Sequence, residues 1–180
     1  MVAAAIVCAA AFAQAGAVSW SVANLPASPA GSIVASTTTY SAWLFIGEDY
    51  TVATTLLDSG DFSGFADLAV ASRDSVATSK GAINFGNATY GSFASETVSA
   101  YAIILDTTVA NMENAGNYLV AVNTSGDEII SQTFTTSGNK NFIWGNQTTN
   151  GATWQSIPEP TSGLLLLLGM AGLALRRRRA

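Results

Sequence analysis

Short apolar runs separated by polar turns fill most of this chain, and this pattern is typical of β-strands. Residues 18–22 alternate apolar and polar side chains with a period of two, which predicts a first strand. Residues 40–46, 96–106 and 117–123 are apolar on both faces. Strands of this kind are central in a sheet and covered on both sides, so we expect a mainly β fold with an enclosed core.

Between residues 46 and 81 the spacing of apolar residues changes to that of short helices. Residues 50–59 predict one helix, and residues 62–72 predict a second. The expected apolar face of the first helix is formed by Val52 and Leu56, to which Ser59 could belong. The expected caps are Asp49 and Gly60 for the first helix, and Asp61 or Ser63 for the second. Phe65, Leu68 and Ala69 are expected on one side of the second helix.

The last third of the body predicts three consecutive antiparallel strands, a meander. Residues 117–123, 128–135 and 140–145 are separated by turn-forming segments at 124–127 and 137–139. Phe142 and Trp144 should share one face. Residues 82–90 are expected to be a loop or a weak edge strand, because Asn84, Gly86 and Asn87 interrupt them.

These elements predict one antiparallel, β-sandwich-like domain over residues 16–145, with one or two short inserted helices. An α+β fold is the alternative, because the helices could supply one of the two layers needed to cover the central strands. Residues 146–157 are polar apart from Trp154. They are expected to form an exposed stalk after the domain.

The charge of the body argues against binding to nucleic acids. Residues 16–157 carry eleven carboxylates and three cations, for a formal charge of −8. Such a domain repels phosphate backbones.

Few residue types that carry chemistry are present. The chain has no histidine and one cysteine, Cys8. The absence of histidine excludes catalytic triads that use imidazole, and it excludes zinc or iron sites that depend on imidazole ligands. We predict no cofactor, no metal site and no catalytic residues. The nearest carboxylate pairs, Asp58 with Asp61 and Asp127 with Glu128, are expected to be solvated turn residues, although a glycosidase would need such a pair. They also lack the spacing of a calcium-binding loop.

The N-terminus predicts a signal peptide over residues 1–15. Residues 2–12 are apolar and uncharged, and Ala13-Gln14-Ala15 fits the small-x-small pattern recognised by signal peptidase. We expect export through the Sec machinery and cleavage after Ala15, with a site after Ala13 as second choice. Either cut removes Cys8 and leaves a body without thiols.

The C-terminus contains three contiguous sequence segments of different character. Pro158-Glu159-Pro160 is an extended break, residues 161–175 are uncharged and predominantly apolar, and a cluster of four arginines follows at Arg176, Arg177, Arg178 and Arg179. The arginines should stay on the cytoplasmic side of a membrane crossed by residues 161–175. A helix of fifteen residues rises about 22 Å, so spanning a core of about 30 Å requires snorkelling arginines or a longer helix.

This order over residues 158–180 resembles the PEP-CTERM sorting signal of Gram-negative bacteria, the substrate of exosortase. The resemblance implies export through the inner membrane, transient anchoring, processing by exosortase near Pro158-Glu159-Pro160, and delivery to the cell envelope, the cell surface or the extracellular matrix. Such systems tend to accompany exopolysaccharide production, which makes exopolysaccharide an expected partner. We therefore expect a non-enzymatic surface or matrix protein. The alternatives are a carbohydrate- or protein-binding module that uses exposed aromatic side chains, and a carboxylate-dependent glycoside hydrolase.

Overall fold

The computed structural model describes residues 16–23, 25–26, 39–47, 49–76, 83–90, 96–134 and 139–158. The predicted signal peptide with Ala13 and Ala15 lies outside this part of the chain. So do residues 159–180, with Glu159, Pro160 and the four arginines. Within the described ranges, no helix combines the length and the apolar character needed to cross a bilayer.

The described elements are mostly strands. In chain order they are β1 (Gly16–Ala23), β2 (Thr39–Ile46), α1 (Thr51–Ser59), α2 (Phe62–Leu68), β3 (Ala71–Val76), β4 (Ile83–Tyr90), β5 (Thr97–Leu105), the 3₁₀-helix η1 (Val109–Asn114), β6 (Asn117–Val120), β7 (Ile130–Thr133), β8 (Asn139–Asn146) and β9 (Gln155–Ser156). The prediction of a mainly β fold with one or two short inserted helices is confirmed, and both predicted helices form, as α1 and α2.

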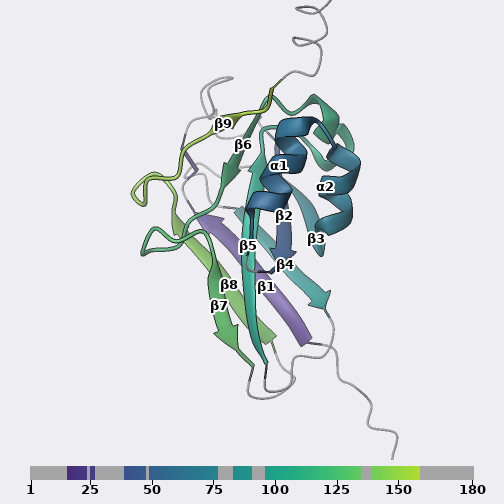
Figure 1. Cartoon of the computed structure of the whole chain (residues 1–180). Coiled ribbons are helices and arrows are strands. Elements are labelled where there is room, and N and C mark those ends of the chain that lie inside the picture. The colour runs from purple at the N-terminus through teal and green to yellow at the C-terminus, as the bar shows by residue number, and fades with distance from the viewer. Residues whose placement is uncertain are drawn as a thin grey trace, which may run out of the picture.

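The strands form two sheets (Figure 1). The smaller sheet has the order β4-β1-β8, so residues 82–90, expected to be a loop or a weak edge strand, contain an edge strand. The larger sheet has the order β3-β2-β5-β6-β9, with β7 also paired to β5. All pairs are antiparallel except β1 with β8, which is parallel.

The smaller sheet covers one face of the larger one. Trp20 of β1 and Trp144 of β8 are buried in one cluster with Leu44 of β2 and Ile104 of β5. Phe142 lies beside Trp144 on the same face of β8, as predicted. This cluster is the core between the sheets.

The two helices cover the opposite face of the larger sheet (Figure 1). Phe65 of α2 lies 5.2 Å from the rings of both Trp43 and Phe45, and Phe45 stacks on Tyr101 at 4.8 Å. Strands β2 and β5 therefore have cover on both faces, which explains why their sequences are apolar throughout.

The predicted face of α1 is right at Leu56, which is half-buried against the cluster under the helices, and wrong at Val52 and Ser59, which are exposed. Ala53 and Leu57 point to the sheet and are fully buried, whereas Val52 is 50 % exposed. Ala53 and Leu57 are four residues apart and lie above one another on the helix, so the small Ala53 lets α1 approach the aromatic side chains beneath it. Gly60 caps the helix in the left-handed conformation (φ = +76°), as expected, while the N-cap is Tyr50 and not Asp49.

The second helix is shorter than predicted. It ends at Leu68, which is 45 % exposed, and residues 71–76 form β3. Strand β3 pairs with β2 at the edge of the larger sheet, and this pairing competes with helix formation over residues 71–72. Asp61 caps the helix through a bond from the Gly64 N–H to its Oδ1 (2.9 Å), which decides between the two predicted caps.

The predicted meander is also wrong. Strands β6 and β7 lie one after the other along the same side of β5, and a loop around residues 123–127 separates them. Strand β8 then crosses to the smaller sheet and pairs with β1. The turn at residues 124–127 exists, but its two flanking strands pair with β5 and not with one another.

Candidate sorting and processing site

The segment predicted as a stalk is part of the folded domain. Residues 155–156 form β9, in which Gln155 and Ser156 pair with Tyr118 and Asn117 of β6. The backbone N–H of Ile157 donates to the Gly116 carbonyl oxygen at 2.9 Å, and the Ile157 side chain is only 7 % exposed. The stalk prediction is wrong because this segment satisfies its polar groups on the domain surface and buries its apolar side chain.

Trp154 was predicted to be exposed and is half-buried instead. Its indole Nε1–H donates to the Pro26 carbonyl oxygen at 2.9 Å. Its ring stacks on Tyr40, with centroids 5.8 Å apart and an angle of 27° between the ring planes. An indole that buries its rings and pairs its one donor is held firmly, so Trp154 anchors the approach to β9.

Gln147 anchors the beginning of the same segment. Its side chain is fully buried and makes the hydrogen bonds that the backbone of a neighbouring strand would otherwise make. The Oε1 atom accepts from the Val122 N–H, and Nε2 donates to the carbonyl oxygens of Val122 and Gly145, all at 2.8 Å. The backbone of Val122, just beyond β6, thereby obtains both of its hydrogen bonds from one side chain.

Tyr118 holds β9 from the domain side. Its hydroxyl donates to Gln155 Oε1 at 2.8 Å. Burial, followed by the charge of the nearby Asp58 carboxylate and a hydrogen bond with it, raises the pKa of Tyr118 to about 12. The phenol therefore stays protonated and keeps its donor at any physiological pH.

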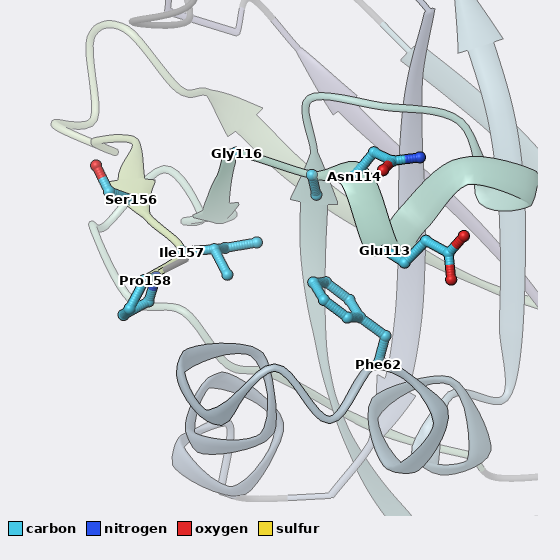
Figure 2. A pocket seen from close by; sticks show the side chains of 8 residues that line it. Phe62, Glu113, Asn114, Gly116, Ser156, Ile157 and Pro158 are labelled. Carbon is cyan, nitrogen blue, oxygen red and sulfur yellow. The ribbon is translucent and has the colours of Figure 1, made fainter. Parts of the chain in front are cut away.

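A pocket of about 500 Å³ adjoins Ile157 and Pro158 (Figure 2). In Figure 2 the side chain of Ile157 points towards the Phe62 ring at the start of α2, and Ser156 points away from the pocket. Glu113 lies on the other side of Phe62 from Ile157. The lining residues are Phe62, Glu113, Asn114, Ala115, Gly116, Ser156, Ile157 and Pro158.

Two aspartates hold the wall of this pocket in place. Asp106 Oδ1 accepts from the N–H groups of Gly116 and Asn117, both at 3.0 Å, and its Oδ2 accepts from the Asn117 side-chain amide at 2.7 Å. Asp74 Oδ1 accepts from the Val109 N–H at 2.6 Å, at the start of η1. In the sequence, both residues are recognisable only as charges. Their role depends on segments that meet only in the folded chain, so no local signal could have revealed it.

Two of the four carboxylates considered for chemistry, Asp61 and Asp127, serve local structure. Asp61 caps α2, and Asp127 closes its loop through two hydrogen bonds with the Asn123 side chain (3.0 and 3.2 Å). Asp58 lies beside Tyr118. Within the described ranges, no three His, Cys, Asp or Glu side chains come close enough together to hold a metal ion.

A carbohydrate-binding module would use exposed aromatic side chains, but three of the four tryptophans are core residues. Trp20, Trp43 and Trp144 are between 0 and 3 % exposed. Among the residues predicted for processing, Pro158 is the last described one, and it is exposed at the rim of the pocket. The domain therefore exposes Pro158, the first residue of the Pro-Glu-Pro tripeptide, on its surface.

The comparisons with known proteins bear on this end of the chain. A family model described as the PEP-CTERM protein-sorting motif matches residues 156–179. The match begins at Ser156 in β9, two residues before the Pro-Glu-Pro tripeptide. The comparisons with curated proteins and with solved structures found no match.

Proposed function

We propose that this chain, a PEP-CTERM protein and exosortase substrate by its sorting motif, is a non-enzymatic protein of the cell surface or extracellular matrix. The observation that carries the proposal is the sorting motif at residues 156–179. The Sec machinery exports the chain, and signal peptidase removes residues 1–15. Residues 161–175 anchor it transiently in the inner membrane, with Arg176 to Arg179 on the cytoplasmic side. Exosortase then processes it near Pro158-Glu159-Pro160.

The use of the acidic side chains supports a structural role for the body. Asp49, Asp61, Asp74 and Asp106 each accept a hydrogen bond from a backbone N–H group of the fold. Carboxylates bound in this way organise loops and helix ends. With its two hydrophobic cores, the domain is a compact unit suited to display on a surface. We propose exopolysaccharide as its matrix partner because of the sorting system that it uses.

Intact-mass analysis of the protein recovered from membrane, envelope and medium fractions tests the sorting route. The wild-type protein should lose both ends and leave the membrane fraction. Glu159→Ala, or replacement of the four arginines by serine, should leave a longer, membrane-bound form. Glu96→Ala is the matched control, because it removes an exposed carboxylate of the domain that lies outside the motif. Maturation of the Glu159→Ala protein like the control would overturn the proposal.

The matrix assignment has its own test. Envelope material from producing cells is treated with an enzyme that depolymerises the exopolysaccharide, and the released protein is measured. Release of the processed protein by this treatment, and not by buffer alone, is the expected result. Retention of all the protein after complete depolymerisation would contradict the matrix role while leaving the sorting route intact.

A further inference from the structure

The sorting motif begins inside the fold. Its first residue, Ser156, is paired with Asn117 in the larger sheet, and its second, Ile157, is buried. Only Glu159 and Pro160 separate the exposed Pro158 from the apolar run that starts at residue 161. The folded domain therefore reaches almost to the segment that anchors the chain.

While the fold extends to Pro158, only the two residues before the apolar run are left as backbone for an enzyme to bind. Two residues span at most about 7 Å, whatever their conformation. An enzyme that cleaves a peptide bond must hold the backbone around that bond in a fixed geometry. While β9 is in place, the N–H of Ile157 is bonded to Gly116 and Ser156 lies in the β6 ladder. Release of residues 155–158 would extend the accessible stretch to six residues, about 20 Å.

The attachments of this segment are few enough to break without unfolding the domain. Strand β9 has two residues, and in the described part of the chain it is the outermost strand beside β6. It is held by its backbone pairing with Asn117 and Tyr118 of β6 and by the Ile157 N–H bond to Gly116. The Tyr118 bond to Gln155 Oε1 and the burial of Ile157 in the cluster under the helices add to these. Short edge segments of this kind open locally at a small fraction of the global unfolding free energy.

We propose that residues 155–158 form a strap that controls the access of exosortase to the sorting motif. When the strap is paired with β6, exosortase cannot bind the first residues of the motif. Processing proceeds from the conformation in which the strap is released. Tyr118, Gln155 and Ile157 are the positioning residues that set the balance between the two conformations. This inference rests on the proposed function, because it presupposes processing by exosortase.

A reversible lock tests the strap directly. Asn117→Cys combined with Ser156→Cys places two thiols on directly opposed residues of an antiparallel pair, whose Cα atoms lie about 4.5–5.5 Å apart, within the range of a disulfide. Thr97→Cys with Thr133→Cys is the matched control lock, since the two hydroxyl oxygens are 2.9 Å apart on β5 and β7. Cys8 in the predicted signal peptide is the single cysteine of the natural chain.

Processing is followed by intact mass in membranes that hold the precursor and exosortase, before and after dithiothreitol. The oxidised strap lock should be processed at least about tenfold more slowly than its own reduced form, while the control lock should be processed equally in both states. The reduced form carries the same two substitutions, so it corrects for any effect of changing Asn117 or Ser156. Equal rates for the oxidised and reduced strap lock would overturn the inference.

A second variant weakens the strap without touching the motif or forming a disulfide. Tyr118→Phe removes the donor to Gln155, and the loss of one net hydrogen bond should raise the released population, and hence the processing rate, roughly fivefold. Tyr101→Phe is the matched control, because its ring is similarly buried on the neighbouring strand β5. A Tyr118→Phe rate equal to or below that of the control would contradict the strap.

The two proposals fail in different ways. If Glu159→Ala blocks processing while the strap variants have no effect, the strap inference is wrong and the sorting route stands. If Glu159→Ala is processed like the wild type, the proposed function itself is wrong.

Discussion

Replacement of the buried Gln147 by alanine should destabilise the domain far more than truncation of an exposed side chain in the same turn before β9. The Gln147 amide makes three hydrogen bonds of 2.8 Å, two to the backbone of Val122 and one to the Gly145 carbonyl. Alanine removes all three. The Val122 backbone is itself buried, so its N–H and C=O groups cannot easily find water instead.

The size of the loss follows from these three bonds. A buried polar group left without a partner costs about 1–3 kcal/mol, and the partly buried Gly145 carbonyl should cost least. Alanine avoids the entropy cost of ordering the glutamine side chain, which returns about 1.5 kcal/mol. We therefore expect a net loss of about 3 kcal/mol in the free energy of unfolding, or about 9 °C in Tm for a domain of this size.

Urea denaturation of the protein purified in mild detergent measures this loss. The buried Trp20 and Trp144 supply a fluorescence signal for unfolding. Thr149→Ala, which truncates an exposed side chain in the same turn, is the control and should change the stability by less than about 0.5 kcal/mol. If Gln147→Ala also stays within about 0.5 kcal/mol of the wild type, the amide does not serve as a strand partner for Val122.

Gln147→Glu provides a pH signature of the same contact. The new carboxylate would face two carbonyl oxygens in a buried site, so its folded pKa should be raised above the unfolded value of about 4.3. The Gln147→Glu variant should be closest to wild-type stability below the unfolded pKa of about 4.3. Its stability should then fall as the pH rises from there through the folded pKa. A pH-independent difference between Gln147→Glu and the wild type would argue against this geometry.

Three further predictions concern the cores and β9. Leu57→Ala should cost about 2–5 kcal/mol in unfolding free energy, since Leu57 is fully buried, and Val52→Ala on the exposed face of α1 should cost less than about 0.5 kcal/mol; urea titrations measure both. Tyr40→Phe should leave stability unchanged or raise it by up to about 1 kcal/mol, because the buried Tyr40 hydroxyl has no partner among the described residues; the urea midpoint decides this. The folded pKa of Tyr118, about 12, exceeds the ordinary tyrosine pKa of 10.0, so stability should fall as the pH rises from 10 to 12. Tyr118→Phe should remove part of that fall in unfolding curves recorded across this range.

Sequence patterns predicted the features that depend on local burial and local chemistry. Strands β2 and β5 are apolar on both faces whatever covers them, so their central positions could be recognised from the sequence. Asp61 and Gly60 act within a few residues of their own positions, and both were predicted as caps. Chemistry that operates over one helical turn is visible in a linear sequence.

Features that depend on distant partners could not be predicted in this way. Val52 is more hydrophobic than Ala53, yet the larger sheet lies under Ala53, and the position of that sheet is a property of the whole fold. The parallel pairing of β8 with β1 joins strands more than a hundred residues apart, and no turn signal specifies it.

The candidate site was misjudged for the same reason. Gln147 and Gln155 are polar, so their segment was predicted to face solvent as a stalk. In the structure, one amide completes the hydrogen bonds of Val122 and the other accepts from Tyr118. A polar side chain whose partner is a distant backbone or phenol group cannot be told from a solvated one by its sequence neighbours.

The most direct test of the account is the intact mass of the protein from cells with active exosortase and from otherwise identical cells without it. We predict that only cells with active exosortase yield a protein that ends near Pro158-Glu159-Pro160 and lacks the apolar run and the arginines. Cells without the enzyme should yield a chain that retains residues 161–180. An identical C-terminus in both samples would contradict the assignment of this chain as an exosortase substrate.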